Sequence, residues 1–115
     1  MLLSERWHPD RLTVPEDVDA QVGWRSVRAK LLARRGSLAE AEALAREATT
    51  EATRTEDIEL QARAFTDLAE VLRLAGRPQE SMAALDSALR LHEQKGNVSA
   101  AASVRALQLE LSVGR

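Results

Sequence analysis

Cysteine is absent from the 115-residue sequence, which excludes a disulfide framework and thiolate chemistry. Long apolar runs are absent as well, and no stretch approaches the roughly 20 residues that a membrane-spanning helix needs. The opening residues, MLLSERWHPD, lack both the basic segment and the long apolar stretch of a signal peptide. These absences lead us to expect a cytoplasmic protein without a membrane partner.

An excess of basic charge is missing too, and aromatic residues are scarce. The formal net charge is −2 and the chain has a single phenylalanine, whereas a nucleic-acid-binding domain usually presents a basic surface and aromatic rings on which bases stack. We therefore expect no nucleic acid partner. Hydrophobic residues make up 44% and charged residues 30% of the chain, which is the balance of a globular domain rather than of a disordered segment.

Residues that commonly carry catalysis or bind metals are few and form no motif. Without cysteine, a zinc site around His8 or His92 would have to be built largely from carboxylates. His92 lies near the end of a predicted helix, where an imidazole can interact with the last carbonyl groups. The carboxylates of EAEALARE and RTEDIE stand beside arginines at helical spacing, which indicates solvated ion pairs. Neither a phosphate-binding loop nor a nucleophile motif is present. We expect no enzyme activity, no cofactor and no metal.

Good helix formers fill most of the chain from about residue 15 onward, and glycine or proline marks the breaks. Gly36, Gly76 and Gly96 suit the left-handed residue that follows a helix. Pro78 suits the first turn of the next one. The closing LQLELSV has weak strand character, but its neighbours SAAASVRA favour a helix. The breaks predict an all-α fold of five helices, near residues 15–35, 38–53, 56–75, 78–95 and 98–112.

Polar residues beside these breaks predict how the helices begin. Ser37 and Glu40 have the S-x-x-E spacing of a capping box. Thr55 and Asn97 are the expected N-caps of the helices that follow them. Thr13-x-x-Glu16 is expected to begin the first helix. We therefore expect an N-terminal arm of residues 1–14 and a single domain of residues 15–115.

The sequence also contains an internal repeat. WRSVRAKLLARRG, which ends at Gly36, aligns without a gap with AFTDLAEVLRLAG, which ends at Gly76. After each glycine comes a helix with small residues at intervals. This pattern resembles the tetratricopeptide repeat, and the resemblance implies a right-handed α-solenoid of antiparallel helix hairpins, here two repeats and a terminal helix. In such hairpins larger residues fill the gaps between helices, and the ones expected to pack together are Phe65, Leu68, Leu72, Met82, Leu85 and Leu89.

A narrower resemblance concerns longer segments. DVDAQVGWRSVRAKLLARRG and LAEVLRLAGRPQESMAALDSALRLHEQKGN look like the C-terminal helical-repeat region of large actinobacterial signalling proteins, which carry a cyclase or transcription-factor head and an ATPase module. The resemblance implies a bacterial signalling context. It transfers no enzyme activity, because the catalytic and phosphate-binding elements of those heads are missing from this sequence.

One short motif points elsewhere. His8-Pro9-Asp10 is the tripeptide that J-domain co-chaperones use, but those domains present it after a basic amphipathic helix. Seven residues precede His8, and Arg6 is the one cation among them. A short tripeptide outside its context is weak support for a function. We interpret the segment instead as an arm in which Trp7 and Pro9 cover the first helix pair.

The first helices of tetratricopeptide hairpins line a concave surface that binds peptides or proteins. The cationic residues expected there favour an acidic or C-terminal carboxylate ligand, since arginine forms charge-assisted hydrogen bonds with carboxylates. The alternative is that these arginines are ordinary solvated residues. The expected groove residues are Ser26, Lys30, Arg34, Arg63, Thr66, Glu70 and Arg73.

The last helix has more apolar residues than one core-facing stripe requires. We expect some of them to be exposed and to support self-association, and the residues chosen are Val104, Leu107, Leu109 and Leu111. The alternative is a terminal helix with a frayed end. Two functions therefore remain open: a non-catalytic protein-interaction module that binds a peptide or protein in its groove, and a structural element that forms a homodimer through its last helix.

Overall fold

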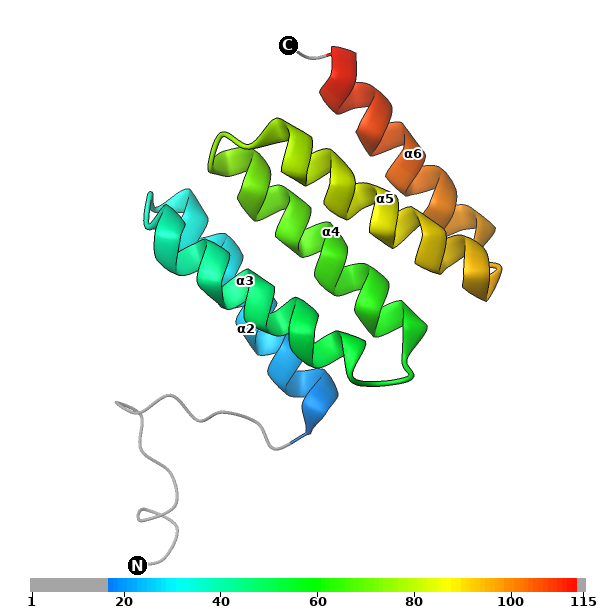
Figure 1. Cartoon of the computed structure of the whole chain (residues 1–115), viewed down its shortest axis with the longest axis horizontal. Coiled ribbons are helices and arrows are strands. Elements are labelled where there is room, and N and C mark those ends of the chain that lie inside the picture. Colours follow the sequence, from blue (N-terminus) through cyan, green and yellow to red (C-terminus); the bar gives the residue numbers. More distant parts are fainter. Residues whose placement is uncertain (1–16, 114–115) are drawn as a thin grey trace, which may run out of the picture.

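The computed structural model describes residues 17–113 and shows an all-α chain, which confirms the predicted fold class (Figure 1). Each predicted helix lies within three residues of an observed one. No strand occurs in the described range. The helices are α2 (Val18–Arg34), α3 (Leu38–Thr53), α4 (Ile58–Leu74), α5 (Pro78–Lys95) and α6 (Val98–Val113).

The predicted N-terminal arm, the His8-Pro9-Asp10 motif and the Thr13-x-x-Glu16 helix start lie outside the described residues. Helix α2 begins at Val18, and the side chain of Asp17 accepts a hydrogen bond from the backbone N–H of Asp19 at 3.2 Å. An aspartate at this position satisfies one of the donors that the first turn of a helix leaves without a partner.

Similar caps precede α4 and α6, at a spacing of 40 residues from Asp17. Asp57 accepts a hydrogen bond from the N–H of Leu60 at 3.0 Å, and Asn97 accepts one from the N–H of Ala100 at 3.1 Å. The expectation for Asn97 is thus confirmed.

The expectation that Thr55 caps α4 is wrong, because Asp57 holds that position. The hydroxyl of Thr55 instead shapes the turn between α3 and α4. It donates to the carbonyl of Ala52 at 2.7 Å and accepts from the N–H of Asp57 at 3.1 Å. A threonine two residues before the true cap therefore positions that cap.

Glycines in the left-handed conformation end three of the helices, as predicted. The φ angles of Gly36, Gly76 and Gly96 are 90°, 78° and 81°. The capping box after Gly36 does not form, because Ser37 makes no side-chain capping bond. Its N–H, which Glu40 would need, donates to the carbonyl of Leu32 at 2.9 Å in the bond that closes the preceding helix.

Small residues allow the helices of a hairpin to lie close together. Ala29 and Ala33 of α2 share one buried cluster with Ala41 and Ala45 of α3. Leucines fill the wider space around α4 and α5, and the predicted packing of six large residues there is confirmed. Leu68, Leu72 and Leu85 are buried in that cluster, and Phe65, Met82 and Leu89 pack against it.

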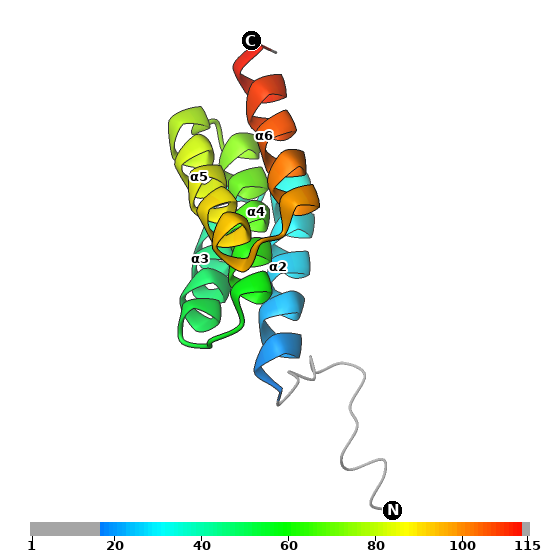
Figure 2. The same cartoon turned by 90° about the vertical axis from the view of Figure 1, so that its right-hand side faces the viewer.

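The helices form two layers. Figure 2 shows α3 and α5 on one side of the molecule and α2, α4 and α6 on the other. The second layer contains the helices that were expected to line a groove. Within residues 17–113, no helix is both long and apolar enough to cross a bilayer.

Candidate functional site

Two ion pairs join α2 to α4 on the expected groove surface. The Nζ of Lys30 lies 3.0 Å from Oδ1 of Asp67, and Nη2 of Arg34 lies 2.6 Å from Oε2 of Glu70. Asp67 was not among the predicted groove residues. It lies four residues after Arg63 and three before Glu70, and this helical spacing could have placed it on the same face. Two of the four predicted cations are therefore already neutralised within the chain.

The two predicted hydroxyl residues are not available to a partner. Ser26 is 3% exposed, so the expectation that it lies on the groove surface is wrong. It follows Val22 and precedes Ala29 and Ala33 at 3–4-residue spacing, and all four are buried residues of α2. The hydroxyl of Thr66 donates to the carbonyl of Ala62 at 3.0 Å within α4.

Arg63 and Arg73 are the predicted cations that remain free. Both are exposed on α4, and neither forms a hydrogen bond or an ion pair with any other residue between positions 17 and 113. An unpaired guanidinium keeps all five of its N–H donors available. Of the seven expected groove residues, these two therefore carry the positive charge that an external ligand could use.

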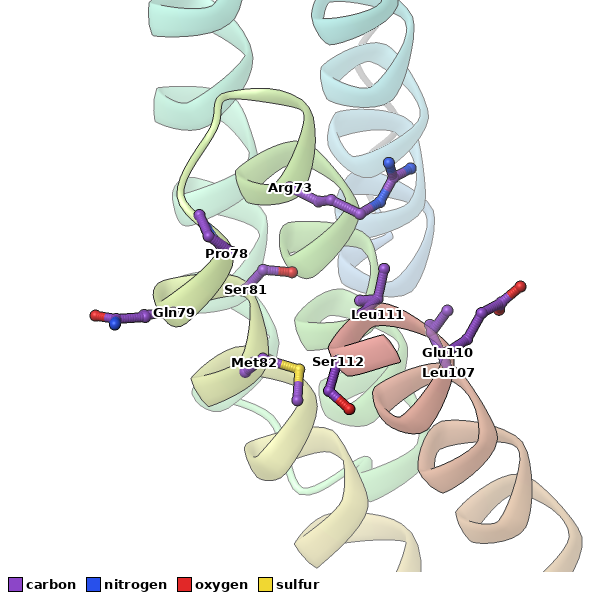
Figure 3. A pocket seen from close by; sticks show the side chains of 9 residues that line it. All are labelled: Arg73, Pro78, Gln79, Ser81, Met82, Leu107, Glu110, Leu111 and Ser112. Atoms are coloured by element: carbon purple, nitrogen blue, oxygen red, sulfur yellow. The ribbon is translucent and has the colours of Figure 1, made fainter. Parts of the chain in front are cut away.

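Arg73 borders a cleft of about 800 Å³ between the start of α5 and the end of α6. Figure 3 shows the side chain of Arg73 near Leu111, with Met82 on the α5 wall and Leu107 on α6. The hydroxyl of Ser81 is not free, since it donates to the carbonyl of Ala69 at 2.7 Å. The lining residues are Arg73, Pro78, Gln79, Ser81, Met82, Leu107, Glu110, Leu111 and Ser112.

Polar contacts hold α6 in the position that forms one wall of this cleft. Gln108 donates to Asp86 of α5 at 2.7 Å. Arg105 also pairs with Glu93 of α5. At the other end of α6, Asn97 donates to Glu59 of α4 at 3.0 Å. These contacts leave the apolar residues at the end of α6 beside the start of α5, where the cleft opens.

The four residues predicted for self-association occupy different environments. Val104 is 5% exposed and belongs to the core, so it is not on the molecular surface as expected. Leu107 and Leu111 are half-buried against the core and border the cleft. Leu109 is 66% exposed. Val113, which was not predicted, is 75% exposed, and its position four residues after Leu109 is the signal that could have found it.

The described residues offer little that resembles a metal centre or a catalytic site. No group of three or more His, Asp and Glu side chains in this part of the chain could hold a metal ion. The imidazole of His92 is buried, and its Nδ1 lies 3.9 Å from Oε1 of Glu59 on α4. That nitrogen makes no hydrogen bond, so the predicted interaction with the carbonyls ending α5 is not formed through it.

Comparisons with known proteins identify no relative. No protein-family model matches the chain. No curated protein and no solved structure matches it either. The side chains themselves are therefore the basis for the functional argument.

Proposed function

We infer that the chain is a non-catalytic protein-interaction module that binds a peptide or protein segment in the cleft between α4, α5 and α6. The observation that carries this proposal is the placement of a free cation beside an apolar recess: Arg73 has no partner in the described range and borders the space that Met82, Leu107 and Leu111 line. Clefts with apolar walls and a few polar groups are the usual form of a binding site.

The chemistry of the cleft defines the ligand. An apolar side chain entering the recess gains about 1.5–3 kcal/mol when it is fully buried. A carboxylate beside it would pair with Arg73, and an exposed pair of this kind contributes about 0.2–1 kcal/mol. The recess therefore supplies most of the affinity and the guanidinium supplies direction. A leucine-like residue next to an acidic side chain or a C-terminal carboxylate satisfies both.

The fold and the wider context belong to the same proposal. The helix starts at residues 18, 58 and 98 and the left-handed glycines 36 and 76 recur every 40 residues, which supports a tetratricopeptide-like stack of helix hairpins. The sequence resemblance to the helical tails of actinobacterial signalling proteins supports a scaffold or regulatory role in bacterial signalling. Other parts of such a protein would supply any catalysis.

A selection experiment tests the binding function. A displayed library of random peptides with free C-termini is selected against the chain, and we expect enrichment of an apolar residue beside a carboxylate. Arg73→Glu should abolish the enrichment. Arg63→Glu is the matched control, because it reverses a second exposed and unpaired arginine of α4 that does not line the cleft. Equal loss with both variants, or no enrichment at all, would contradict the proposal.

Self-assembly through the last helix is the second candidate function. The exposure of Leu109 and Val113 favours it, because these large apolar residues lie on one side of α6 without contacts to the core. This function needs no separate ligand. It is independent of Arg73 and would persist in the Arg73→Glu variant.

A further inference from the structure

The side of α6 that faces away from the stack carries a continuous row of exposed small and apolar residues. Its spacings of 3, 4, 3 and 4 residues are those of one helix face. The opposite face contains Val104, Leu107 and Leu111 and packs on the core. We call the exposed row the outer stripe, and it consists of Ser99, Ala102, Ala106, Leu109 and Val113.

The outer stripe corresponds to a face that is covered elsewhere in the molecule. Helix α2 begins 80 residues before α6, and the residues 80 positions before Ala102, Ala106, Leu109 and Val113 are all buried in the hairpin of α2 and α3. In α6 no helix among the described residues covers this face. The stripe is thus a helix-packing face without its second helix.

We propose that a second copy of this chain covers the outer stripe, with the two α6 helices packed side by side in parallel. The stripe has the spacing of a two-heptad coiled-coil seam, in which Ala106 and Val113 hold the first core position and Ala102 and Leu109 the second. A β-branched residue in the first position and leucine in the second favour two-stranded parallel association.

Charges beside the stripe select the parallel orientation and the second copy as the occupant. Arg105 and Glu110 flank the seam on opposite sides and lie five residues apart, which is the spacing of the ion pairs between parallel helices. Glu110 is exposed and has no partner in the described range. Arg105 pairs with Glu93 in its own chain, but a guanidinium has donors for two carboxylates. Two in-register copies would form two Arg105–Glu110 pairs, one on each side.

The shape of the molecule permits this arrangement. Figure 1 shows α6 at one end of the row of helices, so its outer side is not obstructed by α2, α3 or α4. The two stacks would extend in opposite directions from the seam. The seam spans a single helix, and small interfaces of this kind belong to weak or transient complexes. We therefore expect dimerisation in the micromolar to millimolar range.

Single-cysteine variants test the orientation, because the natural chain has no cysteine. In a parallel seam each Ala106 faces its own counterpart, so Ala106→Cys and Leu109→Cys should each form a disulfide-linked dimer under mild oxidation. In an antiparallel seam residue 106 faces residue 109, and mixing the two variants would give mainly the mixed disulfide. Leu31→Cys is the matched control, because Leu31 is also an exposed leucine but lies on α2. Predominance of the mixed disulfide would overturn the parallel arrangement.

Sedimentation measurements on the full chain test the contact itself. Leu109→Glu should raise the dissociation constant by about tenfold or more, since it places a charge in the seam, whereas Leu31→Glu should leave it unchanged. Arg105→Glu and Glu110→Arg should each weaken the dimer, and the double exchange should restore it. The two residues are too far apart within one helix to pair, so such restoration indicates contact between copies. A chain that remains monomeric at millimolar concentration would overturn the proposal.

Discussion

The close approach of α2 and α3 makes a sharp stability prediction. Ala45 is 1% exposed and shares a buried cluster with Ala29 and Ala33 of α2. Replacing it with leucine inserts three carbon atoms where the helices have no room for them. Overpacking of this kind costs about 1–3 kcal/mol. For a domain of this size each kcal/mol shifts the melting temperature by about 4–8 °C, so Ala45→Leu should lower it by roughly 4–24 °C.

Ala43→Leu is the control for this prediction, because Ala43 is an exposed residue of the same helix. Alanine and leucine have similar helix propensities, so the control should change the free energy of unfolding by less than about 0.5 kcal/mol. Thermal and urea unfolding followed by circular dichroism measures both variants. Equal stability of Ala45→Leu and Ala43→Leu would refute the close helix approach on which the hairpin depends.

Three backbone predictions can be checked in the same unfolding assay. Asp57→Ala should destabilise the chain by about 0.5–2 kcal/mol, since it removes the cap of α4, and an unchanged midpoint would contradict this role. Gly76→Ala should destabilise it by about 1–2 kcal/mol, because the residue has φ of 78°. Gly23→Ala should instead stabilise it by about 0.5–1 kcal/mol, because Gly23 lies inside α2 and an added Cβ meets no atom within 4 Å. Effects of the same sign at the two glycines would contradict this account.

Local signals explain why the helix bounds could be predicted. Glycine and proline interrupt the chain at the positions where helices end and begin, and each acts through its own backbone geometry. The wrong predictions at Ser37 and Thr55 have a common cause. The N–H and hydroxyl groups that capping would use are already committed to the turns that end the preceding helices.

The groove was harder to predict because its charge depends on how α2 and α4 pack. The sequence shows Lys30 and Arg34 as cations, but their neutralisation follows from the position of α4 and of its acidic residues Asp67 and Glu70. The free state of Arg73 and its place beside the cleft likewise depend on the position of α6, which no local pattern specifies.

The outer stripe on α6 lay within reach of the sequence. Extending the 40-residue spacing between Gly36 and Gly76 to the last helix places Leu109 in the position of Ala29 and Val113 in that of Ala33. The prediction of Val104 as a surface residue followed from counting apolar residues, whereas its burial depends on which face of α6 meets α5.

The most direct test of the interaction function is a chemical-shift titration with a peptide selected from the displayed library. The account predicts that the largest changes occur at the methyl groups of Met82, Leu107 and Leu111 and at the side chain of Arg73. Arg63 should be unaffected. Changes centred on Lys30 and Arg34, or spread over the surface without a centre, would contradict a binding site in the cleft.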